Sequence, residues 1–173
     1  MGLILKDSLT PLMKGYPTMS DKYNVRGATL SSESETGYFG NIVTIKGDGY
    51  FKVASDKSTI TKASEVAGVL LATNVKLVTD FFGGSSAKAE TRPGEAFNLL
   101  VGGYVALEVE VTEGSKASDV LALCVEGADA KITANGKVST TGTIDCGWKF
   151  TGVTCVDDNG VALAEVVVFP KNI

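Results

Sequence analysis

The feature that most constrains this chain is the alternation of short apolar runs with glycine-containing turns. Glycine supplies 20 of the 173 residues, well above the usual share of about 7%, and many of these glycines fall between the runs. Tyr38–Lys46, Tyr50–Ala54 and Gly68–Thr73 are short and rich in β-branched and aromatic residues. Such spacing is typical of all-β folds. We therefore predict a compact β-barrel or β-sandwich of about ten short antiparallel strands.

Three pairs of runs are separated by sequences that favour tight hairpin turns. The turn sequences are Gly102-Gly103, Asn135-Gly136 and Asp157–Gly160. The first pair gives the clearest signal, because Val105, Leu107, Val109 and Val111 alternate with polar or small residues after the two glycines. This pattern predicts a half-buried strand. The flanking strands expected for the three hairpins are 96–101 with 104–111, 131–134 with 137–139, and 147–156 with 161–169.

Three further segments complete the expected elements. A turn of helix is expected at Lys62–Val66, and a strand is expected at Asp119–Glu126. Val75–Phe82 fits either a helix or a strand, and its brevity and β-branched content favour a strand.

Residues 1–36 differ from the rest of the chain, because prolines interrupt them and no hydrophobic period is sustained. We interpret them as an extended N-terminal arm whose apolar residues need another surface, and residues 37–173 as the folded domain. A partly disordered terminus is the alternative. The residues of the arm expected to make intermolecular contacts are Leu3, Ile4, Leu5, Leu12 and Tyr16.

Composition argues against most enzyme classes. The chain has no histidine, which removes the commonest general base and imidazole metal ligand. Its net charge is −4, with 16 basic and 20 acidic residues, so no nucleic acid partner is expected. The longest apolar stretch, Val161–Phe169, contains a glutamate and is about half a membrane span. We expect no membrane partner, no catalytic residue, no metal and no cofactor.

A few local patterns resemble chemical sites, but each has a simpler interpretation. Asp157–Gly160 lacks the glutamate that closes a calcium loop, and Gly83–Ser86 lacks the lysine of a phosphate loop. Glu108 and Glu110 lie two apart on one strand face, where solvated charges are the simpler interpretation. The three cysteines are expected as free thiols.

Several phrases of the sequence together resemble the structural-cement, or capsid decoration, proteins of tailed bacteriophages. The likeness spans about residues 37–173 and is carried by turn glycines and alternating strands rather than by a chemical signature. The phrases are Gly37–Val43, Ala67–Leu70, Pro93-Gly94, Val101–Val111, Gly142–Ile144 with Trp148, and Ala164–Phe169.

The resemblance implies a non-enzymatic protein of the virion, made in the host cytoplasm and bound to the outer surface of the capsid. It would bridge neighbouring major capsid proteins as a homotrimer and stabilise the shell against the pressure of packaged DNA. The five apolar residues of the arm would then contact the capsid. The leading alternative is a tail or baseplate β-sandwich that binds host-surface glycan through an aromatic platform at Trp148 and Tyr104. A histidine-free, carboxylate-based hydrolase is a third possibility.

Overall fold

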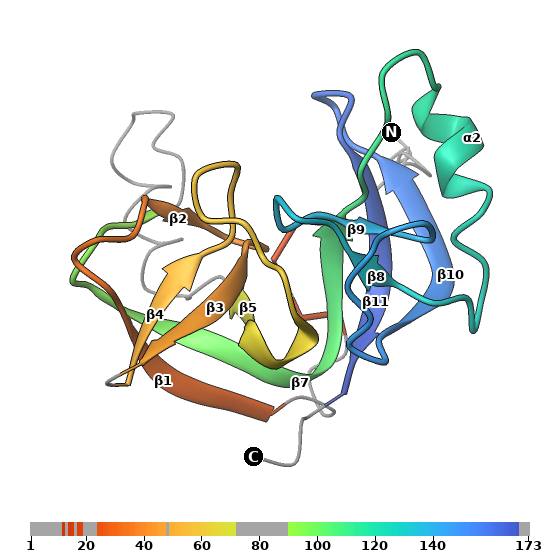
Figure 1. Ribbon diagram of the computed structural model, residues 1–173. Coiled ribbons are helices and arrows are strands. Elements are labelled where there is room, and N and C mark those ends of the chain that lie inside the picture. Colours follow the sequence, from red (N-terminus) through yellow and green to blue (C-terminus); the bar gives the residue numbers. More distant parts are fainter. Residues whose placement is uncertain are drawn as a thin grey trace, which may run out of the picture.

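The computed structural model describes residues 12, 14–15, 17–18, 24–47, 49–71 and 90–169. This part of the chain is almost entirely β-structure, as the sequence predicts, and Figure 1 shows its strands. The segment Val75–Phe82 lies outside the described residues. The elements are β1 (Asn24–Leu30), β2 (Gly37–Tyr38), β3 (Ile42–Gly47), β4 (Tyr50–Val53), η1 (Ala63–Glu65), β5 (Val66–Leu71), β6 (Glu90–Thr91), β7 (Ala96–Glu108), α2 (Ala117–Leu121), β8 (Lys131–Ile132), β9 (Val138–Ser139), β10 (Lys149–Val156) and β11 (Ala162–Val168).

Five strands close into a small barrel. The order is β1-β4-β3-β5-β7, and β7 pairs back onto β1 to close the ring. The pairs are antiparallel except β1 with β4, which are parallel. The barrel prediction is therefore confirmed, with one parallel pair that the hairpin pattern did not indicate.

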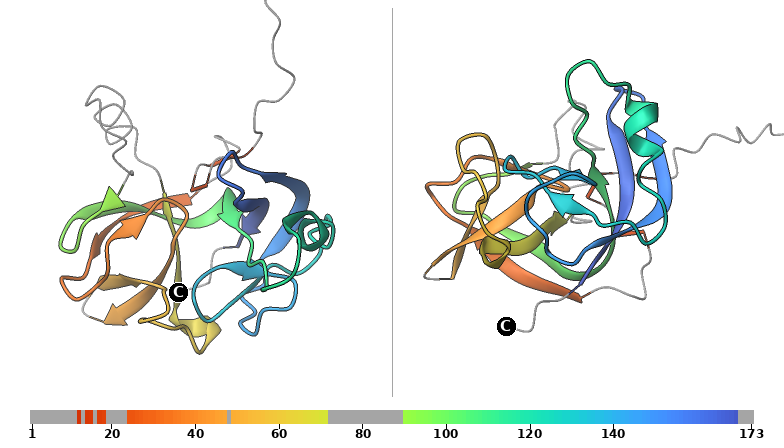
Figure 2. Two further views of the ribbon diagram at one scale, coloured as in Figure 1. Left: turned by 90° about the horizontal axis from the view of Figure 1, so that it is seen from above. Right: turned by 45° about the vertical axis from the view of Figure 1, so that its right-hand side comes forward.

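Strand β7 belongs to both halves of the molecule. Its first half closes the barrel, and its second half pairs with β11, which pairs in turn with β10. Figure 1 shows β7 in green running from the barrel into this second sheet, and Figure 2 shows the two halves side by side. The hairpin expected at Gly102-Gly103 is wrong, because both glycines lie inside one continuous strand.

The side chains of β7 that precede the two glycines and those that follow them face different cores. Phe97, Leu99 and Val101 point into the barrel, whereas Val105 and Leu107 point into the second core. Residues of one parity normally stay on one face of a strand. The switch occurs at a β-bulge: Asn24 of β1 lies opposite Gly102 and Val25 lies opposite Leu100, so β7 has one extra residue here.

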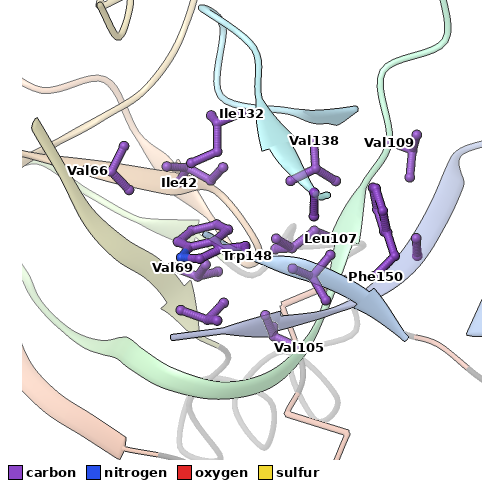
Figure 3. Packing of buried hydrophobic residues seen from close by; sticks show 14 of the residues in the cluster. Ile42, Val66, Val69, Val105, Leu107, Val109, Ile132, Val138, Trp148 and Phe150 are labelled. Carbon is purple, nitrogen blue, oxygen red and sulfur yellow. The ribbon is translucent and has the colours of Figure 1, made fainter. Parts of the chain in front are cut away.

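Two apolar cores result. The barrel core includes Leu30, Val43 and Leu70. The larger core lies between the outside of the barrel and the second sheet, and joins Ile42 and Val69 of the barrel to residues of the C-terminal half. Figure 3 shows this core packed around Trp148. Because barrel residues contribute to the larger core, the two halves share that core.

The strand expected at Asp119–Glu126 is wrong, because this segment begins in helix α2 and continues in turns. Leu121 and Cys124 are buried three residues apart, and Val120 packs beside them. That spacing places all three on one side of a helical turn. The turns predicted at Asn135-Gly136 and Asp157–Gly160 are confirmed, since β8 pairs with β9 and β10 with β11 around them. The helical turn near Lys62–Val66 is confirmed as η1.

The boundary of the expected arm needs correction. β1, within residues 1–36, pairs with β7 over Asn24–Thr29 and with β4 at Thr29 and Leu30. The following turn is also tied down, since the Val53 N–H donates to Ser34 Oγ at 3.0 Å. Residues 24–36 therefore belong to the folded body, because a strand that completes a barrel cannot be detached from it.

The described residues include no helix long and apolar enough to cross a membrane.

Candidate interaction surface

A short N-terminal segment is bound along the edge of β7. We call Leu12, Lys14, Gly15, Pro17 and Thr18 the strap. Its Gly15 N–H donates to the Ala106 carbonyl at 2.9 Å, and its Thr18 N–H donates to the Tyr104 carbonyl at 3.2 Å.

The strap runs antiparallel to β7, with Pro17 opposite Val105. β1 also runs antiparallel to β7, with Asn24 opposite Gly102. The strap and β1 therefore cover successive parts of one edge of β7. An uncovered edge is a template for unwanted pairing, and the strap removes that exposure.

Leu12 anchors the strap on one face of the second sheet. Its side chain is 2% exposed and packs with Ala106 of β7 and Leu163 of β11. The Cys155 thiol of β10 lies 4.0 Å from the Leu12 carbonyl oxygen. Of the five expected contact residues of the arm, Leu12 is thus buried within its own chain. Leu3, Ile4, Leu5 and Tyr16 lie outside the described residues.

Two glycines let the strap lie directly against a loop of the barrel. A Cβ on Gly15 would lie 2.3 Å from the Gly40 nitrogen, and a Cβ on Gly40 would lie 2.6 Å from Cγ of Lys14. Both glycines have positive φ, 75° and 80°. Any side chain here would therefore be strained and would separate the strap from the barrel.

An ion-pair cluster holds the strap to the second sheet. Glu108 of β7 accepts a hydrogen bond from Lys14 Nζ at 2.5 Å and lies 2.7 Å from Lys137 Nζ. Partial burial raises the pKa of Glu108, but the hydrogen bonds and charges of Lys137 and Lys14 outweigh it and hold the pKa below its ordinary value of 4.5. The carboxylate therefore stays charged at neutral pH and links the strap to the loop after β8.

The other candidate chemical groups serve the fold. Glu110 accepts a hydrogen bond from the Asn135 side chain at 3.1 Å. Asp157 accepts the N–H groups of Asn159 and Val161 inside its own hairpin. Burial raises the pKa of Cys124 to about 11, which makes it a poor nucleophile. Among the described residues, no three metal-ligating side chains gather into a site.

The aromatic platform considered for glycan binding is not present at Trp148. Its side chain is 3% exposed and lies within the larger core, as Figure 3 shows. A buried indole cannot stack on a sugar ring. This finding counts against the glycan-binding alternative.

A polar cleft lies where the barrel meets the β8–β9 hairpin. It consists of two adjoining hollows of about 420 and 310 Å³ that share Asp56 and Asn135. Threonine hydroxyls and Glu110 line the larger hollow, and Tyr38 lines the smaller one. These groups can form hydrogen bonds, and in the smaller hollow the Ser55 side chain is hydrogen-bonded to the Glu35 carboxylate. Neither hollow is lined by a cysteine.

Six of the nine large apolar side chains that are exposed among the described residues fall into three pairs. Ile45 and Tyr50 lie at the end of the β3–β4 hairpin, Leu123 and Val125 follow α2, and Val153 and Val156 lie on β10. Sequence reasoning identified none of these six residues as surface residues. It also missed most of the strap, since its partners lie about ninety positions away and leave no local signal.

A family model described as structural cement protein (E217 gp24/Pam3 gp6) matches residues 6–168, nearly the whole chain. No curated protein matches.

Proposed function

Since the chain belongs to the structural cement protein family, we propose that it binds the outer surface of a phage head and bridges neighbouring major capsid proteins. Membership of this family indicates a structural protein of the virion. The bridging stabilises the shell against the pressure of packaged DNA and requires no catalysis. The protein acts by adding contact area at the joints between capsid subunits.

The observation that carries this proposal is the contrast between the interior and the surface of the described residues. The carboxylates considered for catalysis, Glu108 and Glu110, are engaged within the chain. Large apolar side chains such as Tyr50, Leu123 and Val125 are instead 48–58% exposed. Exposed apolar groups near one another are typical of interaction surfaces. A rigid body with several apolar sites suits a protein that contacts more than one subunit.

Within this proposal the arm and the body have different roles. Leu3, Ile4, Leu5 and Tyr16 are the proposed capsid contacts of the arm. Leu12 fixes the point from which the arm leaves the body, because it is buried against β7 and β11. The homotrimer implied by the family resemblance stays a prediction about the capsid-bound protein.

The test uses heads stripped of this protein and purified full-length chain. We expect the chain to sediment with assembled heads, to leave free major capsid protein unbound, and to raise the temperature at which heads release DNA. Unchanged release temperature at saturating protein would contradict the proposal.

A matched pair of variants tests the arm. Replacing Leu3, Ile4 and Leu5 together by serine is expected to weaken binding to heads at least about tenfold, because three buried apolar contacts are lost. Replacing the same residues by valine keeps an apolar surface and should preserve binding. Equal binding by the two variants would show that the body makes the essential contact.

A further inference from the structure

The outer edge of β10 is covered over only part of its length. One side of β10 pairs with β11 at Lys149 and Phe150 and again from Thr154 to Val156. On the other side, the Gly127 N–H donates to the Phe150 carbonyl, the Phe150 N–H donates to the Ala128 carbonyl, and the Ala130 N–H donates to the Trp148 carbonyl, each at 2.9 Å. This cover ends at Phe150. A bulge follows, with Gly152 at φ of 87°, and the strand then continues to Val156.

The register shows which main-chain groups point outward beyond the bulge. The Val109 N–H donates to the Ala162 carbonyl, so Ala162 faces β7 and its neighbour Leu163 faces β10. Leu163 lies opposite Cys155, so the main-chain groups of Cys155 point toward β11. Those of Thr154 and Val156 therefore point away from the sheet, and no described residue pairs with them.

The side chains along this edge do not prevent another strand from pairing with it. Val153 is 41% exposed and Val156 is 45% exposed. Lysine or proline commonly guards a free edge against pairing, but Val153–Val156 contains neither. Glu126 lies against the bulge, because a Cβ on Gly152 would lie 3.2 Å from its nitrogen. Val125, which precedes Glu126 in the chain, is 58% exposed.

We propose that this edge pairs with the same edge of a second copy of the chain, forming a two-fold symmetric dimer with a continuous sheet. The unpaired groups are self-complementary. With Cys155 on the two-fold axis, Thr154 of each copy lies opposite Val156 of the other, and the two residues exchange both N–H···O bonds. Every outward main-chain group of Thr154 and Val156 is then satisfied.

The length of the free edge also fits a second copy. The free stretch is Val153–Val156, and the hairpin turn at Asp157–Gly160 ends β10 directly after it. In the symmetric pair, the turn of each copy reaches the bulge of the other, where Gly152 lies against Glu126. The second copy thus lies along the exposed Val153 and Val156.

The proposed dimer contact at β10 is separate from capsid binding and from the contact that would form the predicted homotrimer. An interface in which the same residues face each other has two-fold symmetry, so the predicted trimer would require another surface. All measurements below use the purified full-length chain without capsids. A failure here leaves the proposed function standing, and a failure of head binding leaves this dimer standing.

The first test is the mass in solution by sedimentation or light scattering. We expect the mass to rise from 18.0 kDa toward twice that value with concentration. Val156→Pro removes an N–H that no described residue accepts, which an edge strand tolerates, and it should keep the protein monomeric. Val156→Thr retains the N–H and should still dimerise. Val156→Lys is a second, charged variant that should also be monomeric. A wild-type chain that stays monomeric, or dimers in both the proline and lysine variants, would overturn the proposal.

The second test uses the native cysteine on the proposed axis. Directly opposite residues in a non-hydrogen-bonded antiparallel pair have Cα atoms about 4.5 Å apart, which falls within the range that disulfides span. Oxidation with copper–phenanthroline should therefore give a covalent dimer linked through Cys155. Cys155→Ser should abolish this product, and Cys146→Ser should not. A dimer that persists in Cys155→Ser and disappears in Cys146→Ser would contradict the assigned edge.

Discussion

At the scale of single residues, Gly15 and Gly40 let the strap lie directly against a loop of the barrel. Both residues have left-handed backbone conformations, and their main chains touch. Sequence patterns mark such glycines only as possible turns. The structural reason becomes visible when positions 15 and 40, distant along the chain, come together.

Gly15→Ala tests this contact. The new Cβ would lie 2.3 Å from the Gly40 nitrogen, so the strap must move, and we expect the free energy of unfolding to fall by about 1–3 kcal/mol. Gly94→Ala is the matched control, because Gly94 also has positive φ but a Cβ there meets nothing within 4 Å. Urea unfolding measures both variants. An equal loss in the two would assign the effect to backbone strain alone.

Glu108→Gln tests the ion-pair cluster and its pH dependence. The pKa of Glu108 is lowered in the folded state, so its contribution to stability is present above its ordinary value of 4.5 and is lost as the pH falls through the folded-state pKa. We expect the variant to be less stable than wild type by up to about 1 kcal/mol at pH 7. The difference should vanish in strong acid.

Urea unfolding at pH 7 and at pH 2–3 checks this expectation. Glu110→Gln serves as control, since a glutamine oxygen still accepts the hydrogen bond from Asn135. A difference for Glu108→Gln that stays constant with pH would show that packing, not charge, is the source.

At the scale of elements, truncations separate the arm from the body. Removing residues 1–11 leaves every strap contact in place, so we expect unchanged stability. Removing residues 1–18 uncovers the edge of β7 and the site of Leu12, which costs about 2 kcal/mol for the lost leucine burial alone. Removing residues 1–30 also deletes β1, which closes the barrel, and should prevent folding.

Circular dichroism and thermal unfolding of the three truncated proteins check this order. Folding without residues 1–30 would show that the barrel tolerates an open edge. It would also restore the arm boundary at residue 36 that the sequence suggested.

Elements with strong local signals were predictable from the sequence, and elements set by distant packing were not. The turns at Asn135-Gly136 and Asp157–Gly160 form where expected because turn chemistry acts within a few residues. Gly102-Gly103 carries an equally strong turn signal, yet pairing with β1, β5 and β11 keeps the strand continuous through it.

Helix α2 is a second element whose type the local sequence does not determine. Its apolar run fits a strand as well as a helix when taken alone. The choice is made by Leu121 and Cys124 reaching the larger core from one side of a turn. The candidate surface was less predictable still, because exposure of Val153 and Val156 depends on where the cover of β10 ends.

At the scale of the whole molecule, the shared core predicts that the two halves unfold together. Ile42, Val69 and Leu100 of the barrel lie in the same cluster as Trp148 and Phe150 of the C-terminal half. Strand β7 also crosses between the halves without a break. Neither half can therefore unfold without exposing the core that it shares with the other.

The lone tryptophan makes this prediction measurable. Trp148 lies in the larger core, so its fluorescence reports the C-terminal half, while far-ultraviolet circular dichroism reports strands of both halves. We expect the two signals to give one coincident transition in urea, as for a two-state domain. Val69→Ala, on the barrel side of the core, should shift both midpoints equally because it removes buried contacts from the shared interior. A fluorescence transition that precedes the dichroism transition, or that Val69→Ala leaves in place, would instead show that the halves are separate folding units joined only by β7.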